Sequence, residues 1–188
     1  MNMIGNTAVL KKGLFILSAC CGSYILFWLN GYQPEKAFRR SQPLSILLFL
    51  LTFALGAIGL YFIINGMNQF DSKPTPVKGS VIVIMAVIIY VLTAWITLHF
   101  FNRPVTTELL LITLWTALIL QILNVSSAQN LLSHAGMIVS LILLILVFVL
   151  CMVLYVAYYQ MDPWPAYWLA AMPLLAIGIY CSILAFLI

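Results

Sequence analysis

The sequence predicts an all-α, polytopic membrane protein with six transmembrane helices, and three observations lead to this prediction. Of 188 residues, 65% are hydrophobic and only 6% are charged. The mean hydropathy is +1.15. In ordinary soluble domains about a quarter of the residues are charged. A soluble chain of this size could not bury so much apolar surface. This composition excludes a soluble enzyme, a nucleic-acid-binding protein and a disordered regulator.

Six long apolar runs supply the predicted helices. A helix needs about 20 apolar residues to cross about 30 Å of hydrocarbon, and each run approaches or exceeds that length. Backbone groups in lipid must be satisfied within their own segment, which favours helices, and the alternation with a period of two that marks a barrel strand is absent. The predicted spans are 13–29, 43–64, 80–101, 107–125, 135–159 and 166–188.

The first run is interpreted as an uncleaved membrane helix. Its residues 17–20 resemble a bacterial lipobox, but the apolar stretch before them is short for a signal peptide. The apolar character also continues past Cys20 to Leu29.

Polar, glycine and proline residues punctuate the connections between the runs. Proline cannot continue a helix because it lacks the backbone N–H, so segments rich in proline are expected breaks. The expected breaks are 33–40, Asn65-Gly66, 71–76, 102–104 and Asp162-Pro163-Trp164-Pro165. No domain linker separates the runs, so residues 1–188 are predicted to form a single integral membrane domain.

The charged residues fall between the runs, and the net charge is +4. Membrane topology and lipid headgroups explain such charges better than nucleic acid does. The alternating sides of a six-span protein each carry four basic residues: Lys11, Lys12, Lys73 and Lys78 on one side, and Lys36, Arg39, Arg40 and Arg103 on the other. The rule that cytoplasmic loops carry more basic residues therefore does not decide the orientation. The cluster of positive charge at Arg39-Arg40 favours a cytoplasmic position for that loop.

The sequence contains no recognisable arrangement of catalytic residues. The two histidines have no spaced carboxylate partner, and hydrolase, phosphate-loop and dinucleotide motifs are absent. Glu108 begins the fourth span, where a carboxylate complements the helix dipole. The four cysteines lie inside apolar runs and form no CxxC pair, so they are interpreted as small buried side chains. The sequence predicts no catalytic residue, no metal site and no enzyme.

Two helical faces carry neutral polar side chains. On the fourth span Thr113, Ala117, Gln121 and Asn124 share one face at 100° per residue. Amides facing lipid are costly, so this face is predicted to point inward. On the third span a similar stripe contains Tyr90, Ala94 and Thr97. Either the stripes form hydrogen bonds between helices, or they supply the polar groups of an apolar pocket.

Several features from residue 71 onward resemble, in their order, the TspO/MBR family of tryptophan-rich sensory and translocator proteins. Lys73-Pro74-Thr75-Pro76 is similar to the family's loop after its first helix, and Ile89-Tyr90 to its Leu-Tyr pair. Gln121-Ile122-Leu123-Asn124 stands where the family has Gln and Asn, and the Ala/Leu-rich run 166–172 leads into Pro173 as in its last helix. Many of the family's tryptophans are missing from this chain.

The resemblance implies a five-helix bundle over residues 43–188, often a dimer, with 1–42 as an extra N-terminal transmembrane helix and basic loop. It implies binding of a tetrapyrrole, such as haem or a porphyrin, or of a sterol-like molecule. Aromatic rings would stack on the ligand and amides would orient it. The residues expected to line the pocket are Tyr90, Trp95, Trp115, Gln121, Asn124 and Trp168.

The leading functional hypothesis is a protein that binds a hydrophobic small ligand for sensing, sequestration or transport. The alternative is a non-catalytic subunit or assembly factor of a larger membrane complex, for which Gly56 and Gly59 would offer a small-residue stripe to a partner helix. Membrane lipids are expected partners under both hypotheses, and a homodimer is one possible assembly. The expected location is a multi-pass position in the cell membrane, as in a bacterial plasma membrane.

Overall fold

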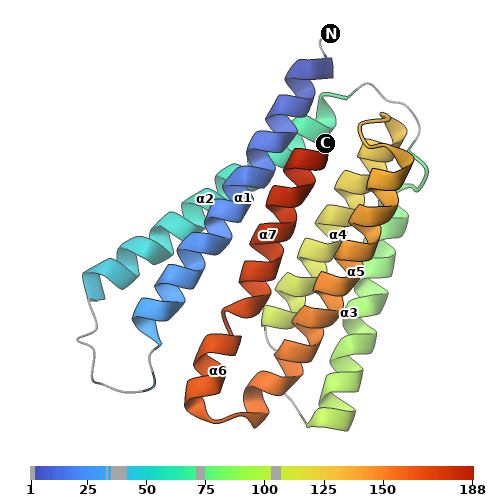
Figure 1. Ribbon diagram of the computed structural model, residues 1–188. Helices are drawn as coiled ribbons and strands as arrows, with labels where there is room; N and C mark the ends of the chain where they lie inside the picture. The colour runs from blue at the N-terminus through green and yellow to red at the C-terminus, as the bar shows by residue number, and fades with distance from the viewer. Residues whose placement is uncertain (1–2, 33, 35–41, 71–74, 103–106) are drawn as a thin grey trace. The chain divides into compact units, whose positions relative to one another are not determined.

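A computed structural model describes residues 3–32, 34, 42–70, 75–102 and 107–188. These residues form helices and their connections and no strand, which confirms the all-α prediction. The basic residues 36, 39, 40, 73 and 103 lie outside the described residues, as do Gln33, Pro74 and Pro104. The elements, shown in Figure 1, are α1 Met3–Gly31, α2 Gln42–Asn68, α3 Gly79–Phe101, α4 Thr107–Ala128, α5 His134–Ala157, the 3₁₀ turn η1 Tyr158–Gln160, α6 Pro163–Leu169 and α7 Met172–Leu187.

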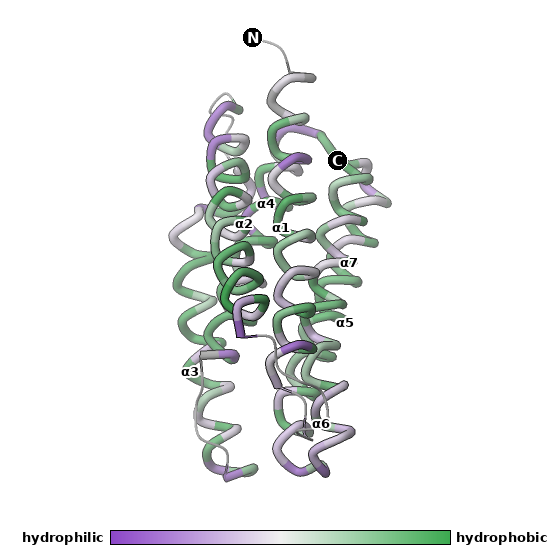
Figure 2. The backbone as a smooth tube through the Cα atoms, turned by 90° about the vertical axis from the view of Figure 1, so that its left-hand side faces the viewer, coloured by the Kyte–Doolittle hydropathy of each residue, from purple (hydrophilic) through white to green (hydrophobic). Residues whose placement is uncertain are grey.

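Six spans within the described residues are long and apolar enough to cross a membrane, with α6 and α7 together making the sixth. Figure 2 shows hydrophobic residues along most of each long helix and hydrophilic residues mainly near the helix ends. The chain is therefore a multi-pass membrane protein.

Two helices extend beyond their predicted ends. α1 begins at Met3 and includes Lys11 and Lys12, since lysine is a good helix former and its charge does not end a helix. α2 continues through Asn65 and Gly66 to Asn68, so the predicted break at Asn65-Gly66 is wrong. The absence of a side chain at Gly66 serves helix packing here, because Gly66 is buried against α1.

The sixth span is not one continuous helix, which corrects the prediction for residues 166–188. α6 ends at Leu169, and α7 starts at Met172. Pro173 lies in the first turn of α7, where a backbone N–H has no partner within the helix, so its absence costs nothing. If α6 continued into α7 as one helix, the missing N–H of Pro173 would instead remove a helical hydrogen bond. Pro163 similarly occupies the first position of α6, so the helices do break at Asp162, but the rest of the predicted break belongs to α6.

Asparagines in the left-handed conformation end two other helices. Asn102 follows α3 with φ 50°, and its N–H donates to the carbonyl of Thr97. Asn130 follows α4 with φ 54°, and the N–H of Leu131 donates to the carbonyl of Ser126 at 2.9 Å. Such caps satisfy terminal carbonyls that would otherwise lack donors in an apolar environment.

The chain divides into two compact units. Unit 1 contains Met1–Asp71 and Asp162–Ile188, and unit 2 contains Ser72–Met161. Unit 1 groups α1 with α2 and α7, and the description of 1–42 as an addition to a bundle of 43–188 stays a prediction. That both units form one integral membrane domain stays a prediction.

In unit 1, α1 lies between α2 and α7 and packs against both (Figure 1). Glycines bring α1 and α2 to backbone contact. A Cβ built on Gly13 would lie 2.8 Å from the backbone N of Ile63, and one on Gly66 would lie 2.9 Å from that of Leu10. Close approach of this kind is how small residues support helix packing in membranes.

The proposed partner stripe of Gly56 and Gly59 is used within the chain. A Cβ on Gly59 would lie 3.2 Å from the backbone N of Leu17, and one on Gly56 would lie 3.4 Å from Cys20 Sγ. Both glycines therefore face α1, and the prediction that they offer a stripe to another protein is wrong.

Hydroxyl groups also join the helices of unit 1. Ser18 Oγ donates to the carbonyl of Gly178 at 2.8 Å and accepts from Ser182 Oγ at 2.9 Å. Ser23 Oγ and Thr52 Oγ1 lie 2.8 Å apart between α1 and α2. These bonds are the interhelical kind that polar residues commonly make in membrane proteins.

Two reciprocal bonds attach α6 to the end of α1. Trp28 Nε1 donates to the carbonyl of Tyr167 at 3.0 Å, and Tyr167 OH donates to the carbonyl of Leu29 at 2.6 Å. Trp28 also stacks on Tyr32, with ring centroids 4.4 Å apart. The short α6 is thus fixed by side chains rather than by its own length.

In unit 2, α4 packs against both α3 and α5. In an apolar stretch of 18 residues, 56% is buried in α4, against 11% in α3 and 17% in the span 134–160 that contains α5. α4 is also the helix that carries the polar face singled out in the sequence, so its burial places this face where a site could form.

Candidate functional site at the C-terminal end of α4

Asn124 is buried and paired with the segment that leads into α3. Its Oδ1 accepts from the N–H of Val77 at 3.1 Å, and its Nδ2 donates to the carbonyl of Val77 at 2.7 Å. A carboxamide offers a donor and an acceptor side by side, as a peptide group does, so it can satisfy both backbone groups of one residue. Thr75 Oγ1 donates to the same carbonyl at 2.8 Å.

Gln121 lies one turn before Asn124, against the first residue of α3. A Cβ built on Gly79 would be 3.5 Å from Gln121 Nε2 and 3.6 Å from Oε1, which is ordinary contact distance. Gln121 Oε1 is buried and has no hydrogen-bond partner among the described residues. A buried acceptor without a donor is costly, and such groups need an explanation.

The threonines of the two predicted stripes are buried but do not bridge helices. Thr113 is 4% exposed, and its hydroxyl donates to the carbonyl of Leu109 in its own helix. Thr97 on α3 likewise donates to Ala94. The burial of Thr113 and Asn124 confirms the inward-facing prediction for α4, whereas the threonines spend their donors within their own helices.

Ser126 Oγ is a second buried oxygen without a partner among the described residues. Ser126 follows Gln121 by five positions, which is about 140° around the helix. The two oxygens therefore point to different sides of α4, and Ser126 does not extend the site at Gln121.

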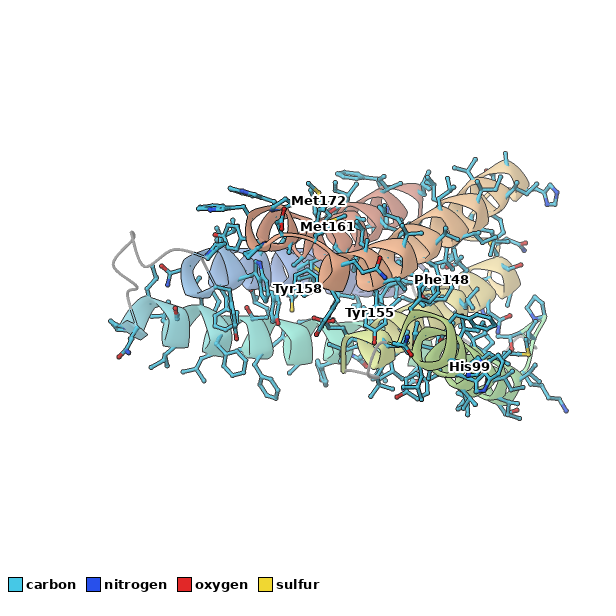
Figure 3. The ribbon with its side chains drawn as sticks, turned by 90° about the horizontal axis from the view of Figure 1, so that it is seen from below. His99, Phe148, Tyr155, Tyr158, Met161 and Met172 are labelled. Carbon is cyan, nitrogen blue, oxygen red and sulfur yellow. The ribbon has the colours of Figure 1, made fainter. Side chains whose placement is uncertain are left out.

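The three aromatic candidates of unit 2 lie farther from the two amides. Trp115 is buried on α4, about 9 Å along the helix from Gln121 at 1.5 Å per residue. Tyr90 is partly buried on α3, about 16 Å along that helix from Gly79. Trp95 is 56% exposed and stacks on His99, which Figure 3 labels on α3, with centroids 5.3 Å apart.

Trp168 belongs to α6 in unit 1 and is 55% exposed. The structure therefore brings Gln121 and Asn124 together, leaves the rings of Tyr90 and Trp95 along the length of α3, and places Trp168 in the other unit. That all six residues line one pocket stays a prediction.

Sequence reasoning missed Val77 and Gly79, the two residues that meet the amides. Both are small or apolar residues near a proline, and nothing in their identity marks a site. The available signal was positional: α3 and α4 are consecutive helices joined by a short link, so the start of α3 was bound to lie near the end of α4.

No metal centre is present within the described ranges, where no three histidine, cysteine or acidic residues gather. Cys20 Sγ donates to the carbonyl of Thr52 at 3.3 Å, and Cys21, Cys151 and Cys181 are buried. Three of the four cysteines are thus buried as their apolar surroundings predicted, and Cys20 is half-buried.

Comparison with known proteins adds no relative to this description: no protein-family model, no curated protein and no solved structure matches the chain. The resemblance to the TspO/MBR family stays a prediction that only the quoted motifs support.

Proposed function

We propose that the chain is a non-catalytic integral membrane protein that binds a hydrophobic small molecule beside Gln121, in a cell membrane such as the bacterial plasma membrane. The observation that carries this proposal is the buried, unpaired Gln121 Oε1 at the contact between α4 and the start of α3. In a largely apolar helix, an unpaired buried acceptor can orient a ligand that brings a donor.

The chemistry of that oxygen limits the ligand. Oε1 only accepts hydrogen bonds, so it selects a molecule with an O–H or N–H on an apolar framework. A sterol hydroxyl meets this requirement, and so does a protonated propionic acid of a porphyrin. These are the two ligand classes that the TspO/MBR resemblance implies, and sensing, sequestration or transport would all begin with such binding.

The test is a titration of the detergent-purified full chain with protoporphyrin, haem and a fluorescent sterol, following quenching of the five tryptophans. We expect saturation at micromolar ligand or below for at least one probe. For a sterol, the 3-O-methyl ether is the matched probe, because it keeps the apolar framework and removes the donor. It should bind about 3- to 10-fold more weakly, as expected for one lost hydrogen bond.

Two variants separate a site from general partitioning. Gln121→Leu should weaken binding and leave the unliganded chain as stable as before or more so, since it removes an unpaired buried oxygen. Thr113→Val, on the same face but about 12 Å away along α4, should leave binding unchanged. Non-saturating quenching by every probe would contradict the proposal and favour a search for protein partners.

A further inference from the structure

Asn124 was expected to contact the ligand, yet its amide is already occupied by the backbone of Val77. Both hydrogen bonds join α4 to residues 75–78, which precede the first residue of α3 and are not helical. The side chain of Asn124 is 8% exposed. Its position therefore suits holding the chain in place better than reading a ligand.

The segment held by Asn124 leads directly to the contact with Gln121. Val77 pairs with Asn124, and Gly79, two residues later, lies against the Gln121 amide. Because α3 starts at Gly79, the held segment and the first turn of α3 together cover the side of α4 on which both amides lie. The turn of α3 that contacts Gln121 is thus continuous with the segment that Asn124 holds.

Residues 75–78 have a restricted backbone, and the residue that follows them, at the start of α3, is a flexible glycine. Pro76 fixes its own φ and restricts Thr75 to extended conformations. Lys78 is also extended, with φ −63° and ψ 134°, and is followed by Gly79. Glycine gives the backbone its widest freedom, so a change of direction between Lys78 and α3 meets little resistance.

We propose that Asn124 is a latch that holds residues 75–78 over Gln121 and thereby controls access of the ligand to Gln121 Oε1. This inference rests on the proposed function for the ligand, but the latch itself can be tested without one. Asn124 is then a positioning residue, and Gln121 is the residue that contacts the ligand.

The first test is hydrogen exchange of the Val77 amide in the detergent-solubilised full chain. Its N–H donates to Asn124 Oδ1, so Asn124→Leu should make it exchange much faster. Asn124→Asp keeps an acceptor for the Val77 N–H but sets an oxygen against the Val77 carbonyl in place of the Nδ2 donor, so its protection should fall between those of Asn124 and Asn124→Leu. Thr113→Val should leave the exchange at Val77 unchanged. Unchanged exchange in Asn124→Leu would overturn the latch.

The second test is the kinetics of protoporphyrin binding by stopped-flow tryptophan quenching. With Gln121 intact, Asn124→Leu should raise both the association and dissociation rates by about tenfold, the size expected for losing two neutral hydrogen bonds. The dissociation constant should change much less than either rate. A weakened affinity with unchanged rates of association would instead make Asn124 a ligand contact and overturn the proposal.

The two proposals fail in different ways. If Val77 exchange responds to Asn124→Leu but protoporphyrin binds neither chain saturably, the proposed porphyrin-binding function and the gating role both fall, while the pairing of Asn124 with Val77 stands. If protoporphyrin binds and depends on Gln121 but Val77 exchange does not respond, the proposed function stands and the latch falls.

Discussion

The two units of the chain use their hydroxyl side chains in different ways. In unit 1, Ser18, Ser23 and Ser182 form hydrogen bonds that cross from one helix to another, and the Ser23 hydroxyl also bonds to a carbonyl of its own helix. In unit 2, Thr113 and Thr116 donate to carbonyls four residues earlier in their own helix. Both arrangements satisfy the hydroxyl, but only the first contributes to holding helices together.

The same contrast holds for backbone contact. Gly13, Gly59 and Gly66 bring α1 and α2 so close that an added methyl group would meet backbone atoms. At the contact of α3 with α4, by comparison, Gly79 faces the end of the Gln121 side chain at ordinary distance. Unit 1 is thus built for fixed packing, whereas the contact in unit 2 leaves a polar group unpaired where a ligand could bind.

The largest effect is expected from adding a methyl group at the contact between α1 and α2 in unit 1. Gly13→Ala places a Cβ 2.7–2.8 Å from Ile63, including its backbone N, so α1 and α2 must separate. We expect a loss of about 1–3 kcal/mol in the free energy of unfolding, the usual range for overpacking. The measurement is reversible unfolding in mixed micelles, followed by circular dichroism.

The matched control is Gly22→Ala on the same helix, where a Cβ would meet nothing within 4 Å. Alanine is the better helix former by about 1 kcal/mol, so this variant should be unchanged or more stable. Equal effects of the two substitutions would mean that α1 and α2 do not pack at backbone contact.

A smaller effect should come from the hydroxyl chain of unit 1. In a double-mutant cycle with Ser18→Ala and Ser182→Ala, we expect a coupling of about 0.6 kcal/mol, typical of hydrogen bonds between membrane helices. A second cycle with Ser23→Ala and Ser182→Ala should give a coupling near zero, because Ser23 pairs with Thr52 instead. Equal couplings would show that the bonds seen at Ser18 are not specific.

The smallest effect is expected where a hydroxyl bonds only within its helix. Thr113→Val should change the free energy of unfolding by less than about 0.5 kcal/mol. Valine keeps the shape of the side chain, and the only hydrogen bond lost is the one that the Thr113 hydroxyl makes within its own helix. The same substitution at Thr52 in unit 1 should cost more, because it leaves Ser23 Oγ without its partner across the helix pair. A larger cost at Thr113 than at Thr52 would reverse the comparison between the units.

The sequence by itself determined the six spans, because a long apolar run without the alternation of a barrel strand can satisfy its backbone in the bilayer only as a helix. It also determined which face of α4 is buried, since helical spacing puts Thr113 and Asn124 on one side. Both conclusions depend on local properties of a single segment.

Only the tertiary structure decided what those residues contact. Gly66, an apparent helix end, proved to be a packing position because Leu10 of α1 lies against it, and Asn124, an apparent ligand contact, proved to hold Val77. The break between α6 and α7 was also hidden, because one proline near the start of an apolar run either kinks a helix or starts one. For Gly66 and Asn124 the deciding interaction comes from a segment distant in sequence, which composition and periodicity do not encode.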